Sequence, residues 1–205
     1  MSASSTAKLR IGSRGSDLAL WQARFTSSHI DEPNDIVIIK TEGDRIQHLS
    51  LDKVEGKGFF TKEIEAALLA GDVDVAVHSF KDLPIEQPAG LSIAAVPARG
   101  PTRDVVLRRA DGPTSTLLWG LAQGARVGTS SLRRKAQILS LRPDLELVDL
   151  RGNVPTRVRK VVEGALDAVI LAEAGLVRLG FAEHALRDGL VLEVIAAKDV
   201  CPAPA

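Results

Sequence analysis

The sequence predicts an α/β protein built from two lobes of similar construction. Apolar, β-branched runs alternate with amphipathic stretches along the chain, which is the pattern of strands alternating with helices. Pro97, Gly100 and Pro101 interrupt this alternation, so we place the crossing between the lobes there. The same order of elements then repeats, which favours two βαβ-type lobes flanking a cleft over one continuous sheet.

The first lobe is predicted to cover residues 1–98, with residues 196–205 returning to it. Its strands are expected at residues 9–12, 35–41 and 73–79, and its helices at residues 17–30 and 59–71. Gly71 is expected to end the second helix, because glycine readily adopts the left-handed conformation found after helix C-termini. Residues 90–109 are predicted to form two further strands, separated by the Pro/Gly interruption.

The second lobe is predicted to cover residues 99–195 and to repeat the order of the first. Its strands are expected at residues 125–130, 145–153 and 166–175, and its helices at residues 131–142 and 154–165. Each lobe opens with a strand, a glycine, a hydroxyl residue, a basic residue and a helix. Each ends with a helix, small residues, an aspartate and an apolar strand, which indicates equivalent folds.

Composition narrows the classes of partner. Lys and Arg number 26, as do Asp and Glu, so no net field draws the molecule to nucleic acid or to a membrane surface. The single cysteine, Cys201, allows no internal disulfide and is typical of a reducing compartment. No apolar run approaches the roughly 18 residues that a membrane span requires. We therefore expect a cytoplasmic protein with no nucleic-acid or membrane partner.

Polar and basic side chains gather where the predicted strands end. In the first lobe they are Ser13, Arg14, Ser16, Lys40, Thr41, Asp44, His78, Ser79, Lys81 and Asp82. In the second lobe they are Thr129, Ser130, Ser131, Arg133, Arg134, Arg151 and Asn153. Ligands of open α/β sheets bind beyond the carboxyl ends of the strands, so we expect these side chains to face the cleft. Guanidinium groups capture carboxylates and phosphates, so the sequence predicts a small ligand with several anionic groups.

Simpler interpretations exist for single members of these clusters. Ser16 and Ser131 are equally consistent with helix N-caps. Arg133 and Arg134 lie beside Lys135, and three consecutive helical positions cannot all face one way, so we expect at least one surface charge among them. His78 by itself favours a hydrogen-bonded structural histidine. What favours a binding site is the whole set, because five polar clusters occupy equivalent strand ends.

Other chemistries lack their motifs. The chain has no Gly-rich loop ending in GK[ST], no HExxH and no cysteine pair, so we expect neither nucleotide hydrolysis nor a metal site. "GSRGS" matches neither the nucleophile elbow nor the dinucleotide fingerprint. Aromatic side chains are scarce, with five Phe, two Trp and no Tyr, so base-stacking platforms are not expected.

Five segments together resemble one enzyme family. They are "RIGSRGSDLALWQA" (10–23), "GKGFFTKEIEAALLAGDVDVAVHSFKDLP" (56–84), "VGTSSLRRKAQIL" (127–139), "LRGNVPTRV" (150–158) and "DAVILAEAGLVRLG" (167–180). In this order they closely resemble hydroxymethylbilane synthase, also called porphobilinogen deaminase. The resemblance implies two periplasmic-binding-protein-like (type II) α/β domains and a smaller third domain. It also implies head-to-tail polymerisation of porphobilinogen into a linear tetrapyrrole, with release of ammonia, on a covalently held dipyrromethane primer.

The resemblance assigns roles to individual residues. Asp82 matches the catalytic aspartate of the family, which would hydrogen-bond pyrrole N–H groups and stabilise the cationic species formed as ammonia leaves. Phe60 matches an aromatic residue near the pyrrole rings. The positions that match binders of primer or substrate are Arg14, Ser16, Lys53, Lys57, Ser79, Lys81, Thr129, Ser130, Ser131, Arg133, Arg134, Arg151, Gly152, Asn153, Arg157 and Arg178. Porphobilinogen and oligopyrroles carry the carboxylates that the basic clusters require.

The end of the chain departs from the family pattern. In the family the stretch resembling "CPAPA" (201–205) continues into the remainder of the first domain and then a third, α+β domain, which is expected to be missing here. The cysteine that anchors dipyrromethane lies in that third domain, so the attachment residue is expected to be absent, and Cys201 does not match it. A separate third-domain chain or self-association would then complete the protein.

Three functions follow from these observations. The first is a transferase like the family, and the second is a non-catalytic binder of pyrrole carboxylates or other polyanions. The third is a repurposed cleft with hydrolase-like activity built on Ser79, Ser130 or His78.

Overall fold

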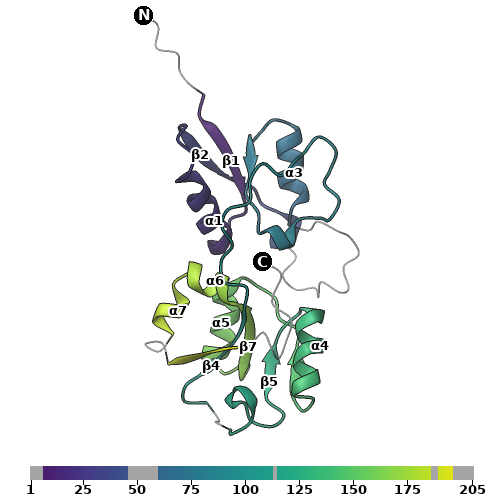
Figure 1. The fold of residues 1–205 in the computed structure, drawn as a ribbon, viewed down its shortest axis with the longest axis vertical. Coiled ribbons are helices and arrows are strands. Elements are labelled where there is room, and N and C mark those ends of the chain that lie inside the picture. Colours follow the sequence, from purple (N-terminus) through teal and green to yellow (C-terminus); the bar gives the residue numbers. More distant parts are fainter. Residues whose placement is uncertain (1–6, 46–59, 113–114, 186–188, 196–205) are drawn as a thin grey trace, which may run out of the picture. The chain divides into compact units, whose positions relative to one another are not determined.

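A computed structural model describes residues 7–45, 60–112, 115–185 and 189–195. Contacts divide the chain into two compact units at the step from Ala98 to Arg99 (Figure 1). We call the described residues up to Ala98 unit 1 and those from Arg99 onward unit 2. Three residues singled out from the sequence, Lys53, Lys57 and Cys201, lie outside the described residues, as does the segment 196–205.

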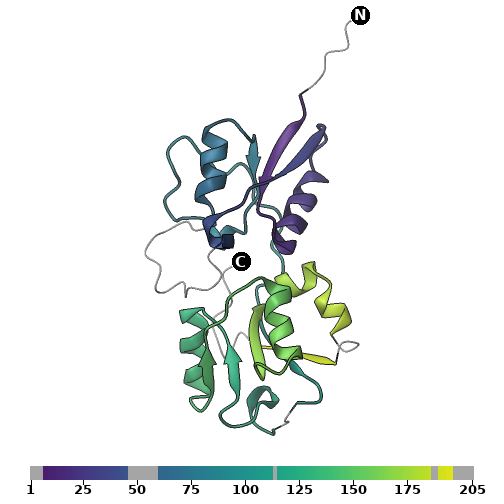
Figure 2. The same ribbon diagram turned by 180° about the vertical axis from the view of Figure 1, so that it is seen from behind.

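Unit 1 contains a parallel sheet of three strands in the order β2-β1-β3. The strands are β1 (Leu9–Ser13), β2 (Asn34–Ile38) and β3 (Val75–Ala76), and the helices are α1 (Asp17–Ser27), α2 (Glu42–Arg45), α3 (Lys62–Leu69) and the 3₁₀ turn η2 (Phe80–Asp82). The central strand β1 contacts both α1 and α3, which lie on either side of it in Figures 1 and 2. Gly71 follows α3 with φ of 74°, so the predicted helix end is confirmed.

Two sequence predictions for unit 1 and the crossing were wrong. The strand expected at residues 73–79 is limited to Val75–Ala76, because Ser79–Asp82 curl into η2, where the Asp82 amide donates to the Ser79 carbonyl at 2.9 Å. Of the two strands expected at residues 90–109, only β4 (Asp104–Arg109) forms in the described structure. Pro97 and Pro101 have no N–H to donate to a ladder, and residues 92–99 are exposed.

Unit 2 contains a mixed sheet of five strands in the order β6-β5-β7-β4-β8. The strands β5 (Arg126–Gly128), β6 (Glu146–Val148) and β7 (Ala168–Ala172) are parallel, whereas β4 is antiparallel to β7 and to β8 (Leu190–Val194). The helices are α4 (Leu132–Leu141), α5 (Val154–Val162), α6 (Glu173–Arg178), α7 (Phe181–His184) and the 3₁₀ turn η3 (Leu118–Gly120). The strand expected at residues 166–175 therefore ends early, because Glu173 begins α6.

The two units repeat one strand order. In unit 1 the first strand lies between the second and the third, as β2-β1-β3, and in unit 2 the equivalent order is β6-β5-β7. In both units the three strands are parallel, so their carboxyl ends meet at one edge of the sheet. The prediction of two α/β lobes of like construction is confirmed.

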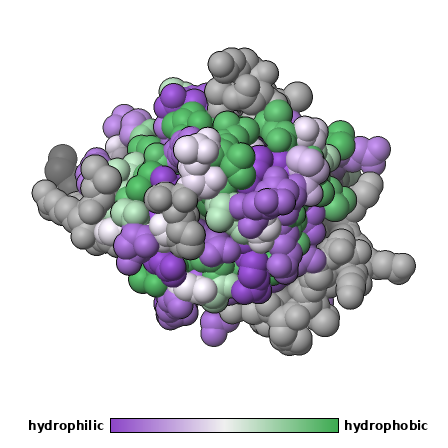
Figure 3. All heavy atoms as spheres, turned by 90° about the horizontal axis from the view of Figure 1, so that it is seen from below, coloured by the Kyte–Doolittle hydropathy of each residue, from purple (hydrophilic) through white to green (hydrophobic). Residues whose placement is uncertain are grey.

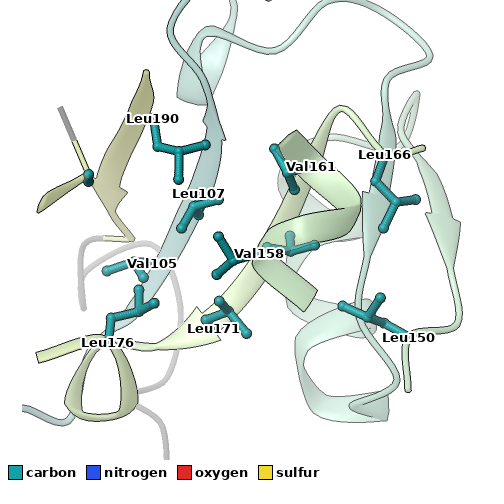
Figure 4. Packing of buried hydrophobic residues seen from close by; sticks show 11 residues of the cluster. Val105, Leu107, Leu150, Val158, Val161, Leu166, Leu171, Leu176 and Leu190 are labelled. Atoms are coloured by element: carbon teal, nitrogen blue, oxygen red, sulfur yellow. The ribbon is translucent and has the colours of Figure 1, made fainter. Parts of the chain in front are cut away.

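The core of unit 2 occupies both faces of its sheet. Along β4 the side chains alternate, so Val105 and Leu107 enter one buried cluster and Val106 enters the other. Figure 4 shows Val158 of α5 pointing toward Leu107 and toward Leu171 of β7. β4 therefore contributes side chains to both layers of the core, as does β7.

Replacing Leu107 by alanine tests this placement. Leu107 has no exposed surface, so Leu107→Ala should lower the free energy of unfolding by about 2–5 kcal/mol through lost burial and the cavity left behind. Leu139→Ala on α4, where the side chain is 40% exposed, is the control and should cost roughly 0.5 kcal/mol. Urea unfolding followed by circular dichroism measures both, and equal losses would contradict the assigned core.

Candidate functional site

A pocket lies at the carboxyl ends of β1 and β3 in unit 1. Its cavity is about 60 Å³, and its lining includes six residues singled out from the sequence and four others: Arg14, Ser16, Phe60, His78, Ser79 and Asp82, with Leu18, Ala19, Gln22 and Val77. We call it the unit 1 pocket. Segments far apart in the sequence meet here because parallel strands deliver their following loops to the same edge.

A cation and a ring form one wall of the unit 1 pocket. The guanidinium carbon of Arg14 lies 4.1 Å from the centroid of the Phe60 ring. This cation–π contact orders the Arg14 side chain against the aromatic face of Phe60. An aromatic surface and a cation side by side suit a ligand that has both a flat ring and a carboxylate.

The hydroxyl groups of Ser16 and Ser79 behave differently from simple caps. Ser16 occupies the N-cap position of α1, yet its side chain makes no capping hydrogen bond and lines the pocket. Ser79 instead pairs with the amide of Gln22, with Nε2 to Oγ at 3.0 Å and Oγ to Oε1 at 3.2 Å. Gln22, which sequence reasoning missed, thus ties α1 to the loop that carries Asp82. Gln22 lies one helical turn after Leu18 and so on the same face of α1, and this spacing could have indicated its place in the pocket.

His78 lines the same pocket as Asp82. Burial lowers the pKa of His78 below its ordinary value of 6.5, and Arg14 lowers it further, against the opposing charges of Glu65 and Asp82. The imidazole is therefore neutral at neutral pH. Asp82 ends the short turn η2 and is exposed at the pocket. A neutral ring beside an exposed carboxylate leaves Asp82 free to face a cationic ligand group without competition from an imidazolium.

In unit 2, four arginines gather at the carboxyl edge of β5 and β6. Arg133 and Arg134 both bind Asp104, the first residue of β4, which is 3% exposed. The Nη2 atom of Arg133 lies 2.9 Å from Oδ2, and that of Arg134 lies 2.6 Å from Oδ1. Arg133 and Arg134, although adjacent on α4, thus bind the same carboxylate. Lys135, the next residue, instead pairs with Asp149. Asp104 was not singled out from the sequence.

Arg151 and Arg157 complete this arginine cluster. Burial lowers the pKa of Arg157, and the neighbouring positive charges of Arg134 and Arg151 lower it further. Nε and Nη2 of Arg151 and Nε of Arg134 are buried without a hydrogen-bond partner. Within the described residues neither Arg151 nor Arg157 forms an ion pair. Buried donors with no acceptor are costly, so the cluster could accommodate an anion that the described residues do not supply.

The small polar residues of unit 2 shape the loops around the arginine cluster. The Ser130 hydroxyl donates to the Leu150 carbonyl and accepts from the Leu150 amide, both at 2.7 Å, so its hydrogen is already used. Buried Thr129 accepts from the Ser131 amide at 3.4 Å. The side chains of Ser131 and Asn153 cap α4 and α5 by accepting hydrogen bonds from backbone amides of the first turn. The structure therefore shows Ser131 in the helix-cap role that was one of its two interpretations.

The backbone conformation and the packing at position 152 require glycine. Its φ is 99°, and a Cβ there would lie 2.7 Å from Cγ2 of Thr156. Its carbonyl accepts from Nε of Arg157 at 2.9 Å. The backbone of this loop therefore fixes the direction of one arginine of the cluster.

Some predicted residues are not brought to either cluster. Lys81 is exposed and does not line the unit 1 pocket. Arg178 ends α6, where its Nη2 would lie 3.3 Å from a Cβ placed on Gly100. Within the described residues, no group of three His, Cys, Asp or Glu side chains is placed to hold a metal ion. No described helix is long and apolar enough to cross a membrane.

Comparison with known proteins decides the family. A family model described as "Porphobilinogen deaminase, dipyromethane cofactor binding domain" matches residues 9–205. The chain belongs to the porphobilinogen deaminase family. It is 51% identical over 182 residues to the porphobilinogen deaminase of Geobacter metallireducens, covering 86% of this chain and 56% of that protein. It is 54% identical over 180 residues to that of Syntrophomonas wolfei, covering 85% and 58%. The chain thus spans little more than half the length of these relatives.

Solved structures give weaker likenesses. An ancestral arginine-binding protein bound to glutamine covers 92% of this chain and 79% of its own, with 13% identity and a TM-score of 0.45. The periplasmic VFT2 domain of Bordetella pertussis BvgS covers 96% and 77%, with 15% identity and a TM-score of 0.48. These scores support no argument about ligand, and the fold of each unit rests on its own strand order and on the family.

Replacing Asp104 by asparagine tests its hold on the arginine cluster. Asp104→Asn leaves two guanidinium groups without their carboxylate, so the free energy of unfolding should fall by about 3 kcal/mol. Asp149→Asn removes a carboxylate that is 44% exposed from its contact with Lys135 and should cost under about 1 kcal/mol. Denaturant unfolding measures both. Similar small losses would show that Asp104 does not anchor the cluster.

The lowered pKa of His78 predicts a pH dependence of stability. The pKa of His78 is lower in the folded state than its ordinary value of 6.5, so the unfolded chain takes up a proton first as the pH falls. The contribution of neutral His78 to the free energy of unfolding is therefore fully present above pH 6.5 and is lost as the pH falls through the pKa of the folded state. His78→Gln should therefore make the urea midpoint fall less between pH 7 and pH 5 than it does in the unmodified chain. Measurements at pH 8, where both states carry neutral histidine, provide the control. Parallel curves would contradict the assignment.

Proposed function

We propose that this chain binds porphobilinogen and oligopyrroles and transfers porphobilinogen units to form a linear tetrapyrrole with release of ammonia. The observation that carries the proposal is the set of buried, unpartnered guanidinium donors on Arg151 and Arg134. Each pyrrole of such a chain has an acetate and a propionate group. A growing oligopyrrole thus supplies carboxylates in the number that an under-neutralised arginine cluster requires.

The unit 1 pocket supports the chemical step of the proposal. Phe60 and Leu18 give apolar surface for a pyrrole ring, and Arg14 gives a donor for its carboxylate. The Asp82 carboxylate would accept hydrogen bonds from pyrrole N–H groups and stabilise positive charge on the ring as ammonia departs. A fixed anion at the place where positive charge develops lowers the barrier electrostatically. Neutral His78 avoids opposing that charge.

The residues of unit 2 fit the family's dipyrromethane cofactor. The cofactor carries carboxylates, Arg151 and Arg134 offer buried donors with no acceptor among the described residues, and Arg157 adds a third positive charge beside them. When bound, dipyrromethane supplies the pyrrole to which the first porphobilinogen is joined. We propose that these arginines hold its carboxylates, while Ser130, Ser131 and Asn153 keep the surrounding loops in place.

A binder without catalysis is the second candidate, because the same arginines would hold pyrrole carboxylates without turnover. The hydrolase-like candidate finds less support. Ser79 bonds to Gln22 and Ser130 bonds to Leu150, so neither serine in the described chain has a histidine base as its hydrogen-bond partner.

Arg151→Gln tests the binding part of the proposal. Loss of a charge-assisted contact should weaken porphobilinogen binding by roughly 10- to 100-fold, as measured by calorimetry. Arg159→Gln, an exposed change on α5, should leave the affinity unchanged. If the two variants bind alike, the arginine cluster is not the carboxylate site.

Asp82→Asn separates the transferase from the binder. In the transferase, this isosteric change should preserve porphobilinogen binding and abolish ammonia release in an assay of porphobilinogen consumption. Binding of porphobilinogen by the unmodified protein without ammonia release would favour the binder.

A further inference from the structure

A second cavity lies in unit 2 at the end of the sheet opposite the arginine cluster. It has a volume of about 190 Å³ and is lined by Arg108, Arg109, Gly112, Leu121, Ala122, Gln123, Gly124, Ala125 and Asp167. Gly124 and Ala125 precede β5 and Asp167 precedes β7, so the cavity sits where these strands begin. The arginine cluster sits where they end. We call this cavity the Arg108 pocket.

Arg108 is the incompletely bonded cation of this pocket. Its guanidinium has five N–H donors, of which Nη1 donates to the Arg109 carbonyl at 3.2 Å. Its Nε is buried with no hydrogen-bond partner. Within the described residues no carboxylate pairs with Arg108.

Arg142, in contrast to Arg108, has a guanidinium whose donors are bonded within the chain. Arg142, 5% exposed, donates to the carbonyls of Leu118, Leu121 and Ala122. Its Nε and Nη2 also bind the two oxygens of Asp144, each at 2.7 Å. Both arginines contact the loop that contains η3, yet only Arg142 has its carboxylate. The missing partner of Arg108 therefore points to a ligand.

The loop around η3 is shaped to admit the Arg108 side chain. Gly120 has φ of 62°, and a Cβ there would lie 2.9 Å from Nη2 of Arg108. Trp119 precedes it with φ of 63°, which is unusual for a large residue, and it is 3% exposed. Strained backbone of this kind persists where the surroundings hold it, and it gathers at ligand sites.

The charges and walls of the Arg108 pocket define the ligand. Arg109 donates to the Val161 carbonyl at 3.3 Å and lies 3.4 Å from Asp111, whose side chain is 86% exposed. Asp167 accepts from the Arg126 amide at 2.7 Å. Two guanidinium groups and one carboxylate on the lining favour a monoanion over a dianion. Leu121, Ala122 and Ala125 give apolar contact for a short carbon chain.

We propose that the Arg108 pocket binds a small aliphatic monocarboxylate, with its carboxylate on the Arg108 guanidinium and its carbon chain against Leu121 and Ala125. The planar fork of arginine matches the two oxygens of a carboxylate. Figure 3 views this end of the molecule, and hydrophilic and hydrophobic side chains are interspersed on it without one broad apolar area. A small amphipathic ligand suits such a surface better than a protein partner does.

Titration of the full chain with sodium propionate at constant ionic strength tests the proposal by ¹H–¹⁵N NMR. The amides of Gly120 and Gly124 report on the Arg108 pocket, and the amide of Gly152 reports on the arginine cluster. We expect saturable shifts at Gly120 and Gly124 that weaken at least tenfold in Arg108→Gln. Arg159→Gln, the matched surface change, should leave them unaltered. Shifts confined to Gly152, or unchanged by Arg108→Gln, would overturn the proposal.

Two further measurements keep the result decisive. Arg108→Lys retains the charge without the planar fork and should bind propionate with intermediate affinity, so the proposal can be tested even if Arg108→Gln does not fold. Succinate, a dianion at neutral pH, should bind with a higher Kd than propionate at the same ionic strength, as read from the shifts of Gly120 and Gly124. An equal or lower Kd for succinate would overturn the assignment to monocarboxylates. None of these readouts depends on tetrapyrrole chemistry.

Discussion

One buried carboxylate organises the arginines of unit 2. Asp104 opens β4, and its two oxygens bind Arg133 and Arg134 from the first turn of α4. This arrangement joins a helix that follows β5 to a strand on the other side of β7. One carboxylate cannot neutralise four arginines, so Arg157 is left with repulsive neighbours and Arg151 with donors that have no acceptor among the described residues. The packing of unit 2 thus leaves more arginines than carboxylates in this cluster, and we call this excess of positive charge the anion deficit.

The polar residues around this deficit divide into two kinds. Hydroxyl and amide side chains such as Ser130, Ser131 and Asn153 spend their hydrogen bonds on backbone groups and hold the loops. The guanidinium groups, with several donors each, keep some unused. In unit 1 the same division recurs, because Gln22 fixes Ser79 while Arg14 and Asp82 line the pocket. Hydroxyl and amide side chains thus hold the loops at this edge of each sheet, and the charged side chains are the ones proposed to contact a ligand.

Sequence patterns predict this edge because they depend on local rules. Alternation of strands and helices placed Arg14 and Asp82 at strand ends, and parallel pairing then brings them to one pocket. The role of Asp104 could not be predicted in this way, since it depends on the antiparallel pairing of β4 with β7. The apolar pattern before Pro97, within residues 90–96, suggested a strand as well. Whether such a segment pairs depends on a neighbouring strand edge, which local composition does not supply.

The arginines of unit 2 differ in how far the described residues satisfy their donors. Arg142 has a carboxylate and three carbonyls, so a further anion would have to displace one of them. Arg108 and Arg151 have buried nitrogen atoms with no acceptor, and each such atom lowers the stability of the unliganded chain. A ligand that binds only the folded state stabilises it in proportion to the logarithm of its concentration over its Kd. Binding of an anion at either place would thus be coupled to folding, because it would complete interactions that the described residues leave open.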